Sequence, residues 1–563
     1  MKKHICTWIS AAIICATLCG TLPVSAEQAA ETHAENPAEA SDSCGENLTW
    51  NFDSESGTLT ISGSGAMDFQ GEYYAPWANL RGRIHAVSLP DGLTKIDTNA
   101  FAELRNLKSV TIPESVTEIG ACAFYDCSSL EDIRISDRIT KVGEEILTGT
   151  AWLDSQPDGV VYLGNIAVGY HGNMPQQTEI EIRQGTTVLA ENLFYAQENL
   201  CACTLPDGIV EIPEGCFSLC TALNKITIPD SVECVEDAFQ NVVLPADEFG
   251  VMYVGKWAVG CNNSVPEIRL RQDTIGIADR AFRSCNAKSI ELNDGLTYIG
   301  TLAFSGSKIE SLMIPETVKS VGAGLCNSCS LLKAVHLPDS VTVLADVPVE
   351  KKEQSLSNGM GFFENCKSLE QIDLPAHLTE IGESAFYGCE KLNEIVIPES
   401  VQKIGHSAFG WCKGLRAVTV LNPACAFYDS PLTISDSFSL AAPQMYVYKG
   451  VLKGYEDSPC EEYAAKYGIE FEPIVPEGTY LRGDLNGDGQ VSLEDAQSCL
   501  RAYCRVLSKK PIDLEDAAFR AADIDKDGSI TPEDATYILR YYTVSELSGN
   551  RTSWKQVLAA FGK

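Results

Sequence analysis

One segment recurs along most of this chain of 563 residues, at an interval of 23 residues. The interval separates pairs of prolines, namely Pro90 and Pro113, Pro206 and Pro229, Pro315 and Pro338, and Pro375 and Pro398. It also separates pairs of phenylalanines, namely Phe101 and Phe124, Phe194 and Phe217, and Phe386 and Phe409. A strand and a turn of this length cannot bury an apolar face alone, so neighbouring copies must stack on one another. The repeat therefore predicts a solenoid.

Inside each copy the apolar residues keep fixed places, as in LKSVTIPESVTEIGACAFYDCSS at residues 107–129. We expect the leucine, the alternating isoleucine or valine and the phenylalanine to point inward. The proline ends the strand, because it has no amide hydrogen to donate to a neighbouring strand. The pattern runs over residues 84–421, and a period in the low twenties is typical of leucine-rich repeats. The predicted fold class is multidomain α/β, with this β-rich solenoid followed by a small all-α module.

Two longer units interrupt the array near residues 150–180 and 241–270. The sequence GVVYLGNIAVGYHGN, which begins at Gly159, matches GVMYVGKWAVGCNNS, which begins at Gly250. We expect each to form a hairpin that turns at Gly164 or Gly255, because glycine permits a tight turn. The irregular segment 349–361 predicts a surface loop.

The segments outside the array differ from it in composition. Alternation of apolar and polar residues around Leu59 and Ile61 indicates short strands. The acidic stretch before them has few large apolar side chains and cannot form a packed core. We expect, in order, a disordered acidic leader at 27–43, an N-terminal β cap at 44–83, a C-terminal cap at 422–475, a linker at 476–482 and a tail at 546–563.

The first 26 residues predict a signal peptide. Lys2 and Lys3 precede an apolar stretch from Ile9 to Leu22, and Ala26 ends a site of small residues suited to cleavage. We therefore expect a secreted, extracellular protein. No later run of about 18 apolar residues predicts a membrane span. The net charge of −35, from 77 acidic and 42 basic side chains, argues against nucleic acid as a partner.

The cysteines suggest buried thiols rather than a disulfide framework. Three of the 22 fall in the predicted signal peptide, which leaves an odd number, 19. Five follow the repeat phenylalanine by three residues, namely Cys127, Cys220, Cys366, Cys389 and Cys412. Equivalent residues on stacked rungs have parallel Cα–Cβ bonds, which disfavours a disulfide between them. We expect a ladder of buried thiols.

These repeats resemble the BspA-like leucine-rich repeat proteins. The resemblance rests on the pattern IPxSVxxIGxxAFxxCxxL, on the opening SCGENLTWNFDSESGTLTISGSGAM and on the ending YEDSPCEEYAAKYGIEF. It covers about 430 residues. It implies a curved β-solenoid, secretion and binding to a surface or a protein, and it names no ligand.

A second motif occurs twice near the C-terminus. The sequence DLNGDGQVSLED begins at Asp484, and DIDKDGSITPED begins 39 residues later at Asp523. Alternate oxygen-bearing side chains in such a loop converge on one point, and Ca²⁺ requires six to eight oxygen ligands. Gly489 and Gly528 permit the sharp bend, while Gln490 and Ser529 contribute backbone carbonyls. Two copies in register, each leading into a helix, favour a metal site over an acidic turn.

The sequence therefore predicts two bound Ca²⁺ ions. The predicted ligands are Asp484, Asn486, Asp488, Gln490, Ser492 and Asp495 in the first loop, and Asp523, Asp525, Asp527, Ser529, Thr531 and Asp534 in the second. The twelfth position of each loop is aspartate rather than the usual glutamate.

Residues 483–545, with the GDLNGDG start, resemble a type I dockerin. The resemblance implies a cohesin domain of a scaffoldin as partner, and attachment to a cellulosome-type assembly. The cohesin contacts carried over to this chain are Leu493, Glu494, Leu500, Arg501, Pro532, Glu533, Leu539 and Arg540. Both halves have glutamate, leucine and arginine at these places, so either helix is a candidate for docking.

No catalytic constellation was found in the sequence. The expected exposed strand column includes Thr111, Arg134, Glu291 and His336, and it has no acidic pair on adjacent rungs. A glycosidase requires two carboxyl groups about 5–10 Å apart. Aromatic residues near the cap and the hairpins, such as Trp257, either stack on a ligand or fill local cores.

Three functions remain open at this point. The first is a secreted, cellulosome-associated protein whose solenoid binds a protein, cell-surface or polysaccharide ligand. The second is a polysaccharide-degrading enzyme, a glycosyl hydrolase or lyase. The third is a regulator or inhibitor of secreted enzymes.

Overall fold

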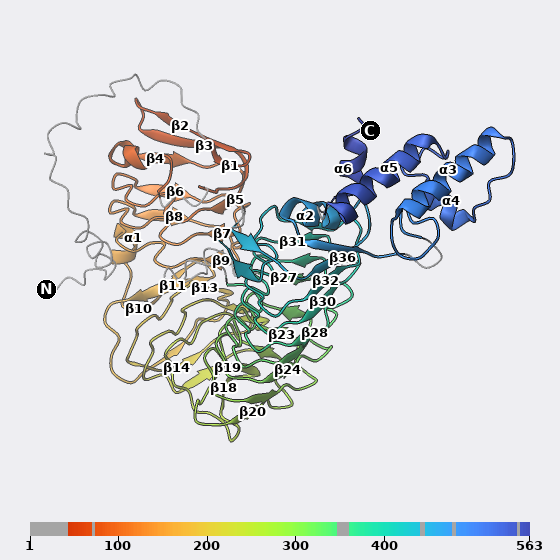
Figure 1. The fold of residues 1–563 in the computed structure, drawn as a ribbon. Coiled ribbons are helices and arrows are strands. Elements are labelled where there is room, and N and C mark those ends of the chain that lie inside the picture. Colours follow the sequence, from red (N-terminus) through yellow and green to blue (C-terminus); the bar gives the residue numbers. More distant parts are fainter. Residues whose placement is uncertain are drawn as a thin grey trace, which may run out of the picture.

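The computed structural model describes residues 43–69, 74–345, 360–439, 445–475, 480–548 and 552–562. The predicted signal peptide, the acidic leader up to residue 42 and most of the 349–361 loop lie outside the described residues. Figure 1 shows a curved solenoid that runs from the strands near the N-terminus to helix α2, followed by a separate group of helices.

The N-terminal cap begins as an antiparallel sheet and ends as a parallel one. Strands β1 (Ser43–Gly45), β2 (Leu48–Asp53) and β3 (Thr58–Ala66) pair antiparallel. Strand β3 then pairs parallel with β4 (Ala86–Ser88) and β5 (Gly92–Ile96), which begin the repeat array. Trp77, just before the 3₁₀ helix η2 (Ala78–Arg83), is buried against Trp50 with ring centroids 5.8 Å apart.

The repeats stack as two columns of short parallel strands. The first column consists of β6 (Ser109–Thr111), β8 (Asp132–Arg134), β12 (Thr178–Glu181), β14 (Leu200–Thr204), β16 (Lys225–Thr227), β20 (Glu267–Arg269), β22 (Ser289–Glu291), β24 (Ser311–Met313), β26 (Ala334–His336), β28 (Gln371–Ile372), β30 (Glu394–Ile397) and β32 (Ala417–Val420). Five of these strands, β6, β8, β20, β24 and β26, bury their central residue and expose the residues on either side. This alternation is the period-two pattern predicted from the repeat.

The second column lies one turn further along each repeat. It consists of β5, β7 (Glu118–Ile119), β9 (Lys141–Val142), β13 (Val188–Leu189), β15 (Glu211–Ile212), β17 (Cys234–Val235), β21 (Gly276–Ile277), β23 (Tyr298–Ile299), β25 (Ser320–Val321), β27 (Val343–Leu344), β29 (Glu380–Ile381), β31 (Lys403–Ile404) and β33 (Ala426–Phe427). Each rung is only two residues long in most copies. The solenoid predicted from the repeat is confirmed.

Both interruptions of the array are β-hairpins. Strands β10 (Gly159–Leu163) and β11 (Ile166–His171) form the first, and β18 (Val251–Val254) and β19 (Trp257–Cys261) form the second. Gly164 and Gly255 lie at the turns with φ of 61° and 57°, a left-handed conformation that favours glycine. The return strand of each hairpin pairs parallel with the next rung of the second column. Helix α1 (Ala151–Asp154) precedes the first hairpin.

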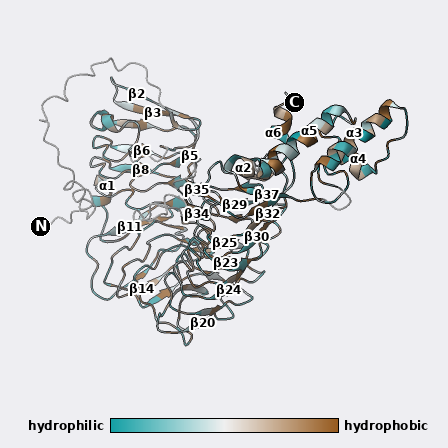
Figure 2. Ribbon diagram, viewed as in Figure 1, coloured by the Kyte–Doolittle hydropathy of each residue, from teal (hydrophilic) through white to brown (hydrophobic). Residues whose placement is uncertain are grey.

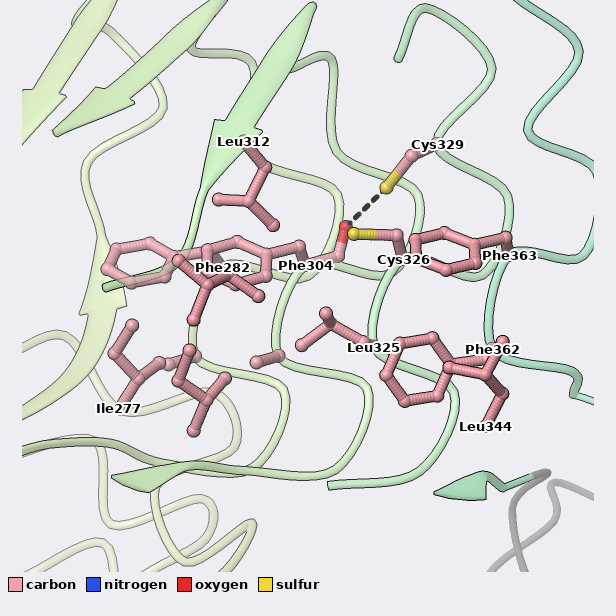
Figure 3. Close-up of a cluster of buried hydrophobic side chains, with 14 of the residues drawn as sticks. Ile277, Phe282, Phe304, Leu312, Leu325, Cys326, Cys329, Leu344, Phe362 and Phe363 are labelled. Atoms are coloured by element: carbon pink, nitrogen blue, oxygen red, sulfur yellow. Dashed lines mark hydrogen bonds between the residues drawn. The ribbon is translucent and has the colours of Figure 1, made fainter. Parts of the chain in front are cut away.

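A stack of phenylalanine rings runs through the core of the repeats. Rings on adjacent rungs, such as Phe386 and Phe409, are nearly parallel, with centroids 5.3 Å apart. Figure 3 shows part of this core, in which Cys326 takes the place of the phenylalanine in one repeat and lies between Phe304 and Phe363. Within each uninterrupted run of repeats, stacked rings let each copy bury the apolar face of the next.

The five repeat cysteines are free thiols, buried as predicted. Each Sγ donates to a backbone carbonyl of the preceding rung, as Cys412 does to Phe386 O at 3.1 Å and Cys389 to Phe363 O at 3.2 Å. Burial raises the pKa of Cys412 to about 12, which keeps this thiol protonated.

The end of the array is closed by a helix and a strand. Strands β34 (Ser437–Phe438) and β35 (Tyr446–Val447) pair antiparallel, and β36 (Val451–Gly454) and β37 (Glu470–Pro473) extend the first column. Helix α2 (Pro459–Tyr467) is capped at its N-terminus by Ser458, whose side chain accepts from the Glu461 amide, and at its C-terminus by Gly468 in a left-handed conformation. Ser458 and Gly468 are residue types favoured at these two ends of a helix.

The C-terminal module is all-α, as predicted. It contains α3 (Leu493–Leu507), α4 (Asp516–Ala522), α5 (Pro532–Tyr542), the π-helix η4 (Thr543–Leu547) and α6 (Trp554–Ala559). Hydrophilic and hydrophobic residues alternate along α3 and α5 in Figure 2, and the apolar faces of these two helices pack together. Among the described residues, no helix is both long enough and apolar enough to cross a bilayer.

Candidate calcium centres and docking helices

The first acidic loop is folded around the carboxylate of Asp484. This residue is 2% exposed, and its two oxygens accept from the amides of Gly487 at 2.7 Å and Gly489 at 2.9 Å. Both glycines have positive φ, 72° and 85°, which the sharp bend requires. The Asp488 carboxylate accepts from the Gln490 amide at 2.9 Å. The loop thus turns back on itself around the buried Asp484 carboxylate, while Asn486, Asp488 and Gln490 are exposed.

The second loop repeats this geometry. Asp523 accepts from the amides of Asp527 at 3.0 Å and Gly528 at 2.8 Å. Carboxylate oxygens of Asp523, Asp525 and Asp527 all lie within 4.8 Å of one another. Three carboxylates at this separation repel each other unless a cation lies between them.

This donor set fits calcium. All the predicted ligand atoms are oxygens, which hard divalent cations prefer, and the predicted set contains no cysteine thiol and no histidine imidazole. In the first loop Asn486 takes the place that Asp525 has in the second, so the first loop has one carboxylate fewer. Asn486 Nδ2 donates to Asp488 at 3.0 Å.

The twelfth residue of each loop ties the loop to the following helix. Asp495 is fully buried and accepts from the amides of Leu485 at 2.8 Å and Ser492 at 2.8 Å. Its partner Ser492 caps α3, and the two residues form a capping box. Asp534 and Thr531 form the same arrangement at the start of α5. Burial raises the pKa of Asp534 above its ordinary value.

The structure therefore brings three predicted ligands of the second loop together, Asp523, Asp525 and Asp527, and gives some predicted ligands of both loops a second role. The hydroxyls of Ser492 and Thr531 donate to Asp495 and Asp534 at 2.7 and 2.8 Å. The oxygens of Asp495 and Asp534 hold the second and ninth residues of each loop in place, and each carboxylate oxygen has lone pairs left for a metal. Direct ligation by these residues stays a prediction.

A family model for the BspA type leucine rich repeat region matches six copies, over residues 79–155, 163–246, 259–358 and 356–429. The matched segments cover more than half of the chain. This chain belongs to the BspA type leucine-rich repeat family. A second family model, the dockerin type I domain, matches residues 482–542. Type I dockerins are calcium-binding domains, and the geometry of the two loops agrees with that class.

Solved structures of bacterial leucine-rich repeat proteins are similar to this chain. A leucine-rich repeat protein from Eubacterium ventriosum is 22% identical with a TM-score of 0.30, over 66% of this chain and 88% of that one. One from Bacteroides ovatus is 19% identical with a TM-score of 0.30, over 77% and 100%. A leucine-rich cell surface protein from Faecalibacterium prausnitzii is 23% identical with a TM-score of 0.26, over 72% and 100%. No curated protein matches the chain.

The two halves of the dockerin present their predicted docking residues differently. On α3, Leu493 and Leu500 are 48% and 40% exposed, and Arg501 and Glu494 are exposed as well. On α5, Leu539 is half-buried against the dockerin core. The three other residues of that half, Pro532, Glu533 and Arg540, are exposed. The leucine of α3 is thus more available to a partner than that of α5.

The dockerin is joined to the end of the solenoid by a buried arginine that sequence reasoning assigned to the linker. Arg482 is 7% exposed and contacts Asp457 of the cap at 2.8 Å. It also donates to the carbonyl of Ile524 in the second calcium loop. Lys526 of the same loop contacts Asp457 at 2.8 Å. In the sequence, Arg482 is a charged residue just before the first calcium loop, and such a residue is normally expected on the surface.

The segment predicted as a tail also joins the dockerin. Trp554 of α6 is buried and stacks on Tyr541 with ring centroids 4.2 Å apart. Helix α4, which precedes the second loop, has only alanines as its buried residues. Its weak apolar pattern explains why the sequence indicated a helix only after each loop.

On the solenoid, each hairpin makes a pocket against the second strand column. The first-hairpin pocket has a volume of about 220 Å³ and is lined by Glu144, Glu191, Tyr170 and Tyr195, among others. Asn192 also lines it and donates to Glu144. Burial, reinforced by neighbouring carboxylates and opposed by Lys141, raises the pKa of Glu191 to about 7.

The second-hairpin pocket, of about 280 Å³, occupies the equivalent place. In the first unit Ala167 pairs with Leu189, and in the second Ala258 pairs with Ile277. Glu191 and Asp279 each lie two residues after the paired residue, so they occupy equivalent places. Arg280, which takes the place of Asn192, contacts Asp237 at 2.7 Å. The first-hairpin pocket is therefore the more acidic of the two. Sequence reasoning examined only the first strand column and missed both pockets.

Trp257, one of the aromatic residues considered for ligand binding, is 2% exposed and fills the core under the second hairpin. Tyr170 is half-buried and lines the first-hairpin pocket. Some of the aromatic residues thus fill the core, as Trp257 does, whereas others, such as Tyr170, line a pocket.

Proposed function

We propose that this protein is a secreted component of a cellulosome-type assembly, anchored through its dockerin to a cohesin domain. The proposal is supported by the paired calcium loops and by the exposed leucine and arginine side chains on the helices that follow them. In this proposal two Ca²⁺ ions are held, one in each loop, by the ligands predicted above.

In this mechanism the residues of the two loops bind calcium and position the helices that follow them. Bound calcium supplies the positive charge that carboxylates such as Asp523, Asp525 and Asp527 need at close range. With that repulsion removed, Asp495 and Asp534 hold each loop against its helix. The helices then present Leu500 and Arg501 as a rigid surface, and binding energy for the metal becomes folding energy for the module.

A test of the anchor uses the full chain and a panel of immobilised cohesins. The double variant Asp484→Asn, Asp523→Asn should lose cohesin binding by at least a hundredfold, whereas Asp207→Asn, an exposed solenoid residue, should bind as the parent does. Binding of the parent should vanish in EGTA and return with excess Ca²⁺. Undiminished binding by the double variant, or in EGTA, would refute the calcium-dependent anchor.

For the solenoid we propose a polysaccharide ligand in the first-hairpin pocket. The pocket combines carboxylates and an amide, which hydrogen-bond sugar hydroxyls, with the rings of Tyr170 and Tyr195, which suit the apolar faces of sugars. The alternatives of a protein ligand or a regulatory partner remain outcomes of the test below.

A second candidate, a polysaccharide-degrading enzyme, is favoured by one observation. A carboxyl group with a pKa near 7, as in Glu191, is partly protonated at neutral pH and can act as a general acid. Glu144 in the same pocket is the candidate for the second carboxylate.

One experiment separates these functions. The parent, Glu191→Gln and the matched control Asp279→Asn are tested for binding to a glycan array and for release of reducing ends from plant polysaccharides. A binding protein has no activity in any of the three and loses affinity in Glu191→Gln. An enzyme loses activity but keeps binding in Glu191→Gln. If the parent neither binds nor cleaves any glycan, the polysaccharide proposal is wrong, and a pull-down from the secretome tests a protein ligand.

A further inference from the structure

One pair of thiols departs from the pattern of the other repeat cysteines. Cys285 follows Phe282 by three residues, the place where the ladder cysteines donate to a backbone carbonyl. The second hairpin separates its rung from the preceding phenylalanine, Phe239. Cys285 instead receives a hydrogen bond from Cys261, with the two Sγ atoms 3.0 Å apart.

These two cysteines occupy different places in the repeat. Cys261 is the last residue of the hairpin strand β19, whereas Cys285 lies in the turn of the next rung. The parallel Cα–Cβ bonds that disfavour a disulfide between ladder cysteines therefore do not apply to this pair. A disulfide bond is about 2.0 Å long, so bond formation requires the sulfurs to approach by only about 1 Å.

The pair is also accessible from solvent on one side. Cys261 is half-buried and lines the second-hairpin pocket, whereas Cys285 is 1% exposed. A small reagent in the pocket can therefore reach the sulfur of Cys261 but not that of Cys285. The equivalent residues at the first hairpin are Tyr170 and Gln197, which cannot form such a bond.

The hydrogen bond between the thiols prepares them for reaction. The proton donated by Cys261 lowers the pKa of Cys285 to about 7, and the same interaction raises that of Cys261. The pair thus holds a single proton near neutral pH and titrates as a unit. Transfer of that proton to Cys285 leaves the thiolate on the accessible sulfur, and the thiolate is the form that attacks disulfides.

We propose that Cys261 and Cys285 form a redox-active pair that closes into a disulfide across the second-hairpin pocket by exchange with a low-molecular-weight disulfide. The Cys261 thiolate attacks one sulfur of the reagent, whose S–S bond breaks and releases one thiolate. Cys285 then attacks the Cys261 sulfur of this mixed disulfide and releases the second thiolate, while its own proton passes to solvent. The protein loses two electrons and the single proton that the pair held, and one reagent disulfide becomes one thiol and one thiolate, which takes up a proton from solvent.

Closure fixes the end of the second hairpin to the rung that follows it, and it changes the wall of one pocket while leaving the other unaltered. The two hairpins therefore differ in a way that the redox state of the surroundings can control. This inference is independent of the dockerin and of the proposed polysaccharide ligand.

The test uses the intact protein, reduced and then equilibrated with oxidised glutathione. After denaturation and alkylation, Cys261 and Cys285 should both be unmodified by the alkylating reagent in the oxidised protein and both alkylated in the reduced protein. Tryptic digestion should give one cross-linked species that joins residues 257–269 to residues 284–288. Cys389 and Cys412, which are fully buried, should remain alkylated and serve as internal controls.

Two variants test the order of the steps. Cys285→Ser should trap glutathione on Cys261 as a stable mixed disulfide, because the second thiol is missing. Cys261→Ser should trap none, because Cys285 is buried. The proposal is overturned if the parent accumulates the mixed disulfide at Cys261, if both cysteines stay alkylated, or if Cys261→Ser takes up glutathione at Cys285.

Discussion

The solenoid and the dockerin of this chain are stabilised in different ways. The larger solenoid core is one continuous cluster from Ala167 to Ile469, built from large apolar side chains and buried thiols. The dockerin core is small, and alanine is its commonest residue. Its second loop brings three carboxylates within 4.8 Å of one another, and in the described part of the solenoid no three acidic side chains lie that close. Under the proposed function, the solenoid folds mainly by apolar burial, while the dockerin also needs a cation.

The most damaging change for the solenoid removes one ring from its phenylalanine stack. Phe386 is fully buried, with ring centroids 5.5 Å from Phe363 and 5.3 Å from Phe409. We expect Phe386→Ala to lower the free energy of unfolding of the solenoid by about 3–5 kcal/mol, because it leaves a cavity that neighbours cannot fill. Urea denaturation followed by circular dichroism measures the loss. Val396→Ala, at a site 53% exposed, should change stability by less than about 0.5 kcal/mol.

The converse experiment acts on the dockerin alone. Removal of calcium with EGTA should expose the amides of residues 484–542 to hydrogen exchange, because the carboxylates of both loops then repel each other. Calcium at a hundred times its dissociation constant stabilises the module by about 2.7 kcal/mol. Exchange in residues 84–421 should stay the same. If both regions lost protection together, or neither did, the proposed difference between them would be wrong.

A third change tests whether the two regions are independent. Arg482 bridges Asp457 of the cap and the Ile524 carbonyl of the second calcium loop. We expect Arg482→Met to destabilise the dockerin by about 1–3 kcal/mol. This is less than the cost of breaking a fully buried ion pair, because Asp457 is 35% exposed and still has Lys526 as a partner in the variant. Hydrogen exchange of the full chain measures it. Lys555→Met, at a site 70% exposed, is the control and should have little effect.

These regions also differ in how much the sequence revealed. Fixed spacing between Pro90, Phe101 and their copies predicted the solenoid, because every rung must bury the same side chains. The calcium loops were predictable because their ligands are local in sequence. The two hairpins were found from their similarity and their turn glycines.

Contacts between distant rungs could not be predicted in the same way. Glu144 and Glu191 are 47 residues apart, and only the hairpin between their rungs brings them to one pocket. In the sequence, nothing sets Cys261 and Cys285 apart from the other cysteines. Their contact arises because the second hairpin interrupts the phenylalanine stack. The burial of Arg482 depends on how the dockerin meets the cap. In each case the deciding contact follows from an irregularity in the array, and a repeat pattern carries no information about irregularities.

The smallest expected effect lies at the junction of the two regions and depends on pH. Glu461 of α2 is 6% exposed, and its carboxylate accepts from the Asp457 amide at 2.7 Å. Burial raises the pKa of Glu461 to about 7, with Arg482 opposing the shift. Burial likewise raises the pKa of Glu456 to about 7.

A raised carboxyl pKa means that the folded protein binds more protons than the unfolded chain between about pH 4.5 and 7. The free energy of unfolding then falls as pH rises through that window. The glutamine side chain of Glu461→Gln cannot ionise, so the variant should be more stable than the parent by about 1–2 kcal/mol at pH 8. The value is at the low end because Glu456, whose pKa is also raised, still ionises in the variant. At pH 4.5 the two proteins should be equally stable.

Urea midpoints at the two pH values measure this difference, with the exposed Glu399→Gln as the control that should show none. A gain that is the same at both pH values would mean that packing, and not ionisation, explains it. A gain in stability that occurs only at high pH would mean that buried, ionisable carboxyl groups lie at the junction between the calcium-dependent dockerin and the apolar solenoid. Alkaline conditions would then loosen the cap before they affect either the phenylalanine stack or the calcium loops.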